Sequence, residues 1–173
     1  VATAQKMAQL DWTIAAQTLE QAFQKSEIAR IEAQDKALDV LLGKAKDAIT
    51  TMTKVLPEKQ KAVPPTTEAK TAAQKAVDEL AAKLAGKKDT ALEKELKTAQ
   101  DKLITAKMTE VSALAAVSAA ESNVKDAEDD LKRITASKAA DTKAVAAANA
   151  AITAAKTAQD KATAELAALK QSL

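Results

Sequence analysis

Apolar side chains recur alternately three and four residues apart along most of this 173-residue chain, and no other feature of the sequence constrains the fold as strongly. The repeat begins at Met7, Leu10 and Ile14 and continues as far as Leu56. Such spacing keeps one narrow stripe of a helix turned toward a partner helix, which is typical of coiled coils. We therefore expect long helices that pair along a seam.

The seam of this first segment is not apolar throughout. It becomes polar at Gln17, Gln21 and Gln24, which either fix register or oligomeric state, as polar core residues can, or mark a point where the contacting face rotates. It is acidic at Asp35, and Glu110 holds a similar seam position later in the chain. A buried carboxylate needs a partner. We expect Lys or Arg on the facing helix, with an ion-binding pair of acids as the alternative.

The same spacing extends over the second half of the sequence. Large residues recur every seven positions and alternate with alanine, as at Leu103, Ala106, Val117 and Ala120. Small side chains let helix backbones approach near the low end of the usual ~8–10 Å separation between axes. This arrangement resembles the tight antiparallel Ala-coils of helical hairpins, and the register continues to Leu173.

The composition agrees with this pattern. About a quarter of the residues are Ala, aromatic residues make up 1%, and only two Gly and three Pro are present. Sheets need aromatic and β-branched residues between Gly- or Pro-containing turns, and Ala buries too little surface to stabilise a conventional globular core. The predicted fold class is all-α: an elongated antiparallel coiled coil or helical hairpin bundle of two to four long helices, with 1–173 as a single unit.

Proline sets the main predicted boundary between helices. We expect a first helix over residues 2–56 and a Pro-rich hairpin tip over 57–67, because Pro64–Pro65 removes two consecutive amide donors. After the tip, Thr66 or Thr67 would cap the second helix.

A weaker interruption follows within this second helix, which we expect over 68–135. A break is possible at 86–89, because Thr90 and Glu93 match a capping box just after it.

The polar run 135–142 is another place for a turn, although no Gly or Pro supports it. Ser137 and Asp141 are its candidate caps, and the last helix would then span 140–173. An uninterrupted helix through this run is the alternative.

The residue types that most catalytic and metal sites need are missing. The sequence has no Cys and no His, so it lacks thiol nucleophiles, thiolate or imidazole metal ligands and the usual proton shuttle. Its two glycines, Gly43 and Gly86, are isolated, which excludes a Gly-rich phosphate loop, and no calcium-binding loop motif occurs. We expect no enzyme activity, no catalytic residues, no metal site and no cofactor.

Charge and hydropathy argue against nucleic acid and against a membrane span. Basic and acidic residues number 26 and 24 and are interspersed, whereas a nucleic-acid binder shows a basic stripe with aromatic platforms. The longest uncharged stretches, Val111–Ala120 and Ala144–Ala155, are shorter than the ~18–20 apolar residues that cross a bilayer. No signal peptide is visible, and because the chain begins at Val1 rather than Met, we expect a processed form or a fragment.

Large apolar residues form a second row in the first helix, on another face than the seam. Trp12, Leu19 and Phe23 belong to it, and Trp12 and Phe23 are the only aromatic residues of the chain. They either pack against another helix of the same bundle or anchor a partner, because aromatic residues are enriched at interface hot spots. These three residues are the candidate partner-contact site.

Two parts of the sequence resemble a known kind of segment. The part around Leu38–Val63 (LDVLLGKAKDAITTMTKVLPEKQKAV) and the C-terminal two-thirds (AAKTAQDKATAELAALK and similar) resemble the Ala-rich coiled-coil insertions or spacers of large bacterial cell-envelope and β-propeller (WD40-type) proteins. The resemblance implies a spacer or assembly arm in a larger bacterial protein, with an extracytoplasmic or cell-envelope location. It assigns no functional residues.

Together these features predict a non-catalytic structural or scaffolding coiled coil that mediates protein–protein assembly or acts as a rigid spacer in a larger complex. Its partners would be other protein subunits or a second copy, bound through helical faces. The alternative is an amphipathic helical protein that binds a lipid or membrane surface reversibly, although its apolar face is narrow and mostly Ala. A helical bundle that binds a small ligand between its helices is a third possibility.

Overall fold

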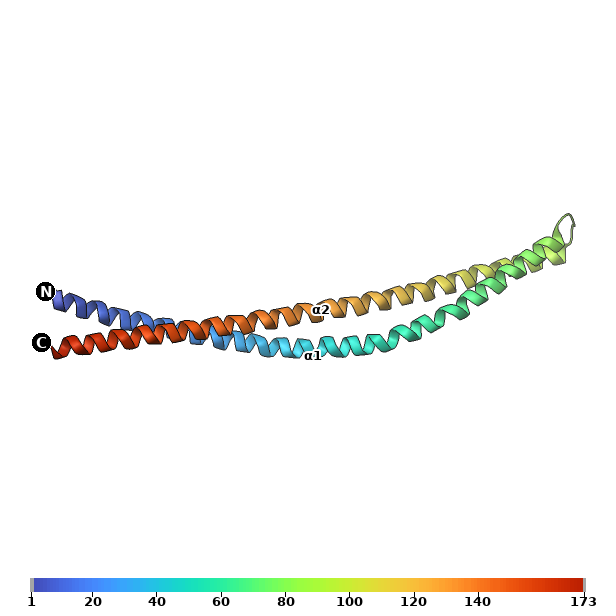
Figure 1. The fold of residues 1–173 in the computed structure, drawn as a ribbon. Coiled ribbons are helices and arrows are strands. Elements are labelled where there is room, and N and C mark those ends of the chain that lie inside the picture. The colour runs from blue at the N-terminus through green and yellow to red at the C-terminus, as the bar shows by residue number, and fades with distance from the viewer. Residues whose placement is uncertain (1, 173) are drawn as a thin grey trace. The chain divides into compact units, whose positions relative to one another are not determined.

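The computed structural model describes residues 2–172, which form two helices joined by a short turn (Figure 1). Helix α1 spans Ala2–Leu84 and helix α2 spans Thr90–Gln171. No strand occurs among the described residues. The predicted all-α class and the helical hairpin are therefore confirmed, with two long helices.

The turn lies at residues 85–89, where the sequence suggests only a possible break. Helix α1 ends there because Gly86 adopts a φ of +73°, in the left-handed region that L side chains avoid. The amide of Lys87 donates a hydrogen bond to the Leu84 carbonyl at 2.9 Å, which satisfies one of the last carbonyls of α1.

Helix α2 begins with a side-chain cap. The Oδ1 atom of Asp89 accepts hydrogen bonds from the amides of Ala91 at 2.9 Å and Leu92 at 3.2 Å. A carboxylate at this end of a helix also interacts favourably with the helix dipole. The cap is therefore Asp89, one residue before the Thr90 that the predicted capping box would use.

The Pro-rich hairpin tip predicted at 57–67 is wrong. Helix α1 continues through all three prolines, so neither Thr66 nor Thr67 caps a new helix. Their hydroxyl groups instead donate to the Val63 carbonyl, at 2.7 Å and 3.3 Å, which is a hydrogen bond typical of helix interiors.

The helix tolerates these prolines because all three lie on its exposed side. A proline inside a helix leaves the carbonyl four residues earlier without its amide donor. Here those carbonyls belong to the exposed residues Thr53, Gln60 and Lys61, where water can supply the missing hydrogen bonds. The opposite side of the same turns, which carries Leu56 and Val63, is half-buried.

Helix α2 runs without a break through residues 135–142, so the uninterrupted alternative is correct and no separate helix spans 140–173. The hydroxyl of Ser137 donates to the Arg133 carbonyl at 3.1 Å, inside the helix, and Asp141 also lies inside it. Polar seam residues alone do not end a helix that contains neither Gly nor Pro.

The chain divides into two compact units, where the sequence predicts one. The terminal unit combines α1 up to Gly43 with α2 from Leu131 onward. The turn unit is Lys44–Asp130 and contains the turn. Each unit pairs a stretch of α1 with an antiparallel stretch of α2, so each has its own part of the seam.

The seam predicted from the heptads forms the core of both units. Every described seam position in the predicted series is buried or half-buried, including the polar ones, and only Leu173 falls outside the described residues. Most of the buried apolar side chains are small: Ile31, Ala45, Ala99, Leu103, Ala127, Ile134, Ala148, Ala155, Ala162 and Leu166. Alanine at these positions lets the two helices approach closely.

The two glycines form a matched pair that tests the turn. An added Cβ meets nothing within 4 Å at either position, so backbone conformation alone decides the effect. Gly86→Ala places alanine in the left-handed region and should lower the free energy of unfolding by about 1 kcal/mol. Gly43→Ala, inside α1, should raise it by about 0.5–1 kcal/mol. Urea unfolding followed by circular dichroism measures both, and a Gly86→Ala chain as stable as the parent would contradict the turn.

Candidate functional site: polar layers and outward faces

Three clusters of polar side chains interrupt the apolar seam, and we call them the polar layers. Each joins α1 to α2 within a single unit, and each includes a seam residue that sequence analysis singled out. In each of them, hydrogen-bonding or charged side chains meet across the two helices.

The first polar layer is made of amides in the terminal unit. Gln21 Nε2 donates to Gln159 Oε1 at 2.7 Å, and Gln159 Nε2 donates to Thr18 Oγ1 at 2.9 Å. Gln17, Gln21 and Gln24 are all half-buried, so the contacting face does not rotate away from α2 here. An amide pair inside a seam is satisfied in only one alignment, which favours the register-setting interpretation of these glutamines.

The second polar layer pairs an exposed carboxylate and a seam carboxylate with one ammonium group. Lys138 Nζ donates to Asp35 Oδ2 at 2.8 Å and lies 2.7 Å from Asp39 Oδ1. Hydrogen bonds to Asp35 and then Asp39 raise the pKa of Lys138, against a smaller opposing effect of desolvation. The expected basic partner of Asp35 is therefore confirmed as Lys138, whereas Asp39 was not anticipated.

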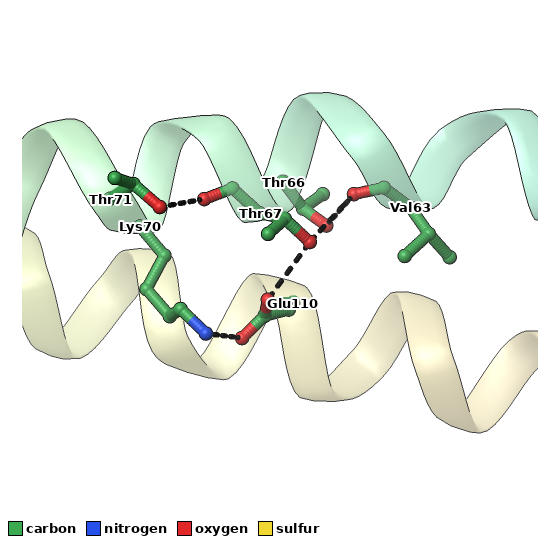
Figure 2. Close-up of polar contacts among 6 residues, drawn as sticks. All are labelled: Val63, Thr66, Thr67, Lys70, Thr71 and Glu110. Atoms are coloured by element: carbon green, nitrogen blue, oxygen red, sulfur yellow. Dashed lines mark hydrogen bonds and ion pairs between the residues drawn. The ribbon is translucent and has the colours of Figure 1, made fainter.

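The third polar layer surrounds Glu110 in the turn unit, and Figure 2 shows its geometry. Lys70 Nζ lies 2.6 Å from Glu110 Oε2, and Thr67 Oγ1 donates to Glu110 Oε1 at 2.9 Å. The Glu110 side chain is only 13% exposed. The hydrogen bond from Lys70, then that from Thr67, hold the pKa of Glu110 below its ordinary value, although desolvation opposes them. The expected basic partner is again confirmed.

One acid beside the second layer has no such partner. Asp141 Oδ2 is buried without a hydrogen bond, at an open groove of about 230 Å³ that Asp35, Glu32 and Lys36 also line. The Asp35 carboxylate beside it is already paired with Lys138. Among the described residues, no group of three or more acidic side chains is placed to hold a metal ion.

A larger open groove of about 550 Å³ lies next to the turn, in the turn unit. Its floor is formed by small and apolar side chains, including Ala73, Leu80 and Ala99. Its charged lining residues, such as Lys94 and Glu95, are exposed to solvent. The groove therefore has no converging set of buried polar groups of the kind that fixes the orientation of a small ligand.

The predicted contact residues Trp12, Leu19 and Phe23 lie on the outside of α1, and we call them the Trp12 face. Their exposed fractions are 73%, 71% and 58%. Trp12 and Leu19 each fall five residues after one seam position and two after the next, which places them on the side of α1 opposite the seam. No described helix covers them, so the alternative that they pack inside a bundle of this chain is wrong.

A second outward apolar face lies on α2 in the turn unit, and sequence analysis did not identify it. It consists of Ile104, Met108, Val111 and Leu114, which are between 50% and 66% exposed, and we call it the Met108 face. Their spacing of four, three and three residues is the signal that could have revealed it. By length and composition alone, α2 also contains a stretch apolar enough to cross a membrane.

Comparison with known proteins adds no relative, because no family model, no curated protein and no solved structure matches this chain. The geometry of the polar layers and the outward faces is therefore the basis for the functional argument.

The Glu110 layer should make stability depend on pH in the acidic range. A carboxyl group whose pKa is lowered by folding stabilises the fold above its unfolded-state pKa, and this contribution is lost as the pH falls through the lower, folded-state pKa. Glu110→Gln should lower the unfolding midpoint at neutral pH and flatten its fall in acid. Thermal unfolding between neutral and strongly acidic pH measures both effects.

The exposed residue Glu58 provides the control, because it lies in the same unit outside the seam. Glu58→Gln should leave the acid dependence of the parent chain unchanged. If Glu110→Gln lost stability in acid as steeply as the parent, the Glu110 layer would not be a source of that dependence.

Proposed function

We propose that this chain is a non-catalytic structural arm. In this proposal an antiparallel coiled-coil hairpin docks other protein subunits through the Trp12 face and acts as a rigid spacer in a larger, bacterial assembly, as the resemblance to Ala-rich spacer segments implies. It uses no cofactor and no metal, and it takes no nucleic acid as partner. The absence of His and Cys from the sequence supports the lack of catalysis.

The observation that carries the proposal is the exposure of three large apolar side chains on a face that α2 does not reach. Burying an exposed side chain of the size of Leu19 or Phe23 contributes about 1.5–3 kcal/mol. Aromatic residues also dominate the binding energy of many interfaces. The Trp12 face thus has the composition of a contact surface, and the two-helix hairpin itself does not use it.

The spacing of the Trp12 face indicates the kind of partner. Leu19 follows Trp12 by seven residues and Phe23 follows Leu19 by four, which is the spacing of anchors that a helix presents to an apolar groove or to another helix. We therefore propose a helical partner surface.

The spacer role rests on the length of the helices. Helix α1 has 83 residues, and at about 1.5 Å per residue its contour is about 125 Å. The proposal requires that the two units keep this contour extended in solution. Small-angle scattering should then give a maximum dimension above about 100 Å, and a much smaller value would remove the spacer role while leaving the docking role to be tested separately.

Alanine substitution tests the Trp12 face. Trp12→Ala with Phe23→Ala should leave helicity and the unfolding midpoint almost unchanged, because both side chains are exposed, and should reduce association with the partner at least tenfold. Val40→Ala is the matched control, since Val40 is an exposed apolar residue of the same helix and unit. A photocrosslinker at Leu19, compared with one at Val40, identifies the partner and measures the loss.

Equal crosslinking from Leu19 and Val40, or crosslinking that the double variant leaves intact, would contradict docking through this face. A marked loss of helicity in the double variant would contradict the exposed position of Trp12 and Phe23 on which the proposal rests.

A second candidate, reversible binding to a lipid surface, is favoured by the Met108 face and by the apolar stretch in α2. Circular dichroism with and without anionic vesicles separates the two candidates. A lipid binder gains helix on contact, whereas a preformed hairpin is already helical. We expect no change in helicity when the vesicles are added.

A further inference from the structure

The turn unit contains a stretch of α2 that lacks charge on every side. Residues 111–120 include no charged side chain. Only Ala113, Ala116, Val117 and Ala120 in this stretch are half-buried, and the other six residues are exposed. A helix that is apolar or uncharged all round is normally covered all round. Here the packing within the hairpin covers one side and leaves the remainder open.

The open side carries the Met108 face. Its four large side chains are at least half exposed. Ala115 and Ser118 continue the same side of the helix with small side chains, which permit the close approach of another backbone. The surface is therefore shaped for a further helix rather than for an extended peptide.

Charged residues frame this surface symmetrically. Lys107, Leu114 and Glu121 are spaced by seven residues and so lie in one row along the edge of the Met108 face. Lys107 and Glu121 are both exposed and carry opposite charges at equal distances from Leu114. Such a row is complementary to itself when a copy is turned end for end.

We propose that the open side of α2 binds the same side of α2 in a second copy of this chain, with the two α2 helices antiparallel and Leu114 at the two-fold axis. In this register Met108 and Val111 of each copy lie over the small residues around Ala115 and Ser118 of the other, and Leu114 meets Leu114. Lys107 of each copy then pairs with Glu121 of the other, and the small residues Ala115 and Ser118 allow the helices to approach. A parallel arrangement in the same register would instead place Lys107 beside Lys107 and Glu121 beside Glu121, which is unfavourable. The contact involves few side chains, so the dimer is weak and depends on concentration.

This contact does not rest on the proposed function. It lies on α2 in the turn unit, whereas the Trp12 face lies on α1 in the terminal unit. Loss of either contact therefore leaves the other available for testing.

Single cysteines test the proposed arrangement directly, because the parent chain contains none. Leu114→Cys should form a disulfide-linked dimer under mild oxidation, since the two thiols meet at the axis. Lys107→Cys and Glu121→Cys should each crosslink poorly alone but readily when the two proteins are mixed. Glu58→Cys, on the exposed side of α1 in the same unit, is the control and should crosslink only at the rate of random collision.

Charge reversal provides an independent test by sedimentation equilibrium. Lys107→Glu and Glu121→Lys should each weaken the dimer several-fold, and the double variant should restore it, because it exchanges the two charges across the axis. Circular dichroism checks that each variant remains helical, which is expected at exposed positions.

Three results would overturn the proposal. One is efficient crosslinking of Lys107→Cys alone, which would indicate parallel helices. Another is a single-chain mass from micromolar to near-millimolar concentration with Leu114→Cys no faster than the control. The third is a chain that stays monomeric yet binds anionic vesicles through Leu114, which would assign the Met108 face to a lipid surface.

Discussion

The packing of small side chains along one narrow seam is the interaction on which the whole structure depends. A buried alanine removes little apolar surface from water, so each seam position contributes modestly. The hairpin compensates with length, because the same contact repeats every three or four residues through α1 and α2. It also compensates with close approach, since alanine at positions such as Ala99, Ala127 and Ala155 lets the backbones lie near one another.

Periodicity predicted the seam correctly, residue by residue, whereas a local rule about proline misplaced the turn. The tip was predicted at 57–67 because Pro64 and Pro65 disfavour a helix. Yet Leu56 and Leu84 are four heptads apart, with Val63 and Val77 in the same series, so the phase of the seam never changes across the prolines. If the chain turned at the prolines, the residues on either side would belong to different helices, and the seven-residue spacing would not need to continue from one to the other. The continuous phase was the stronger signal, because it reflects packing over many turns, whereas each proline costs a single hydrogen bond on a side that water reaches.

The misplaced turn also explains what could not be predicted about the polar layers. Asp35 and Glu110 were expected to need basic partners, because a buried carboxylate is costly unless it is paired. Which lysine serves each acid depends on the alignment of the two helices. With a tip at 57–67, Lys70 and Glu110 would lie on one helix and could not face each other. With the turn at 85–89 they meet across the seam (Figure 2). Asp39 and Thr67, which lie outside the apolar pattern, carry no signal of their roles until that alignment is known.

A two-helix hairpin buries one stripe of each helix and leaves most of its surface exposed to solvent. As a rule, that exposed surface carries polar and charged side chains. Along α1 and α2 the exposed positions are mostly Lys, Glu, Asp, Gln and Thr. The Trp12 face and the Met108 face depart from this rule, and both do so at spacings that keep their apolar residues on one side of a helix. Clusters of exposed apolar side chains are costly in water and favour association, which is why both faces are proposed as contact surfaces. The polar layers reinforce this, because amide and charge pairs accept only one alignment of α1 and α2 within each unit. Each outward face is therefore held by a fixed register rather than by a sliding pair of helices, which is what a specific contact requires.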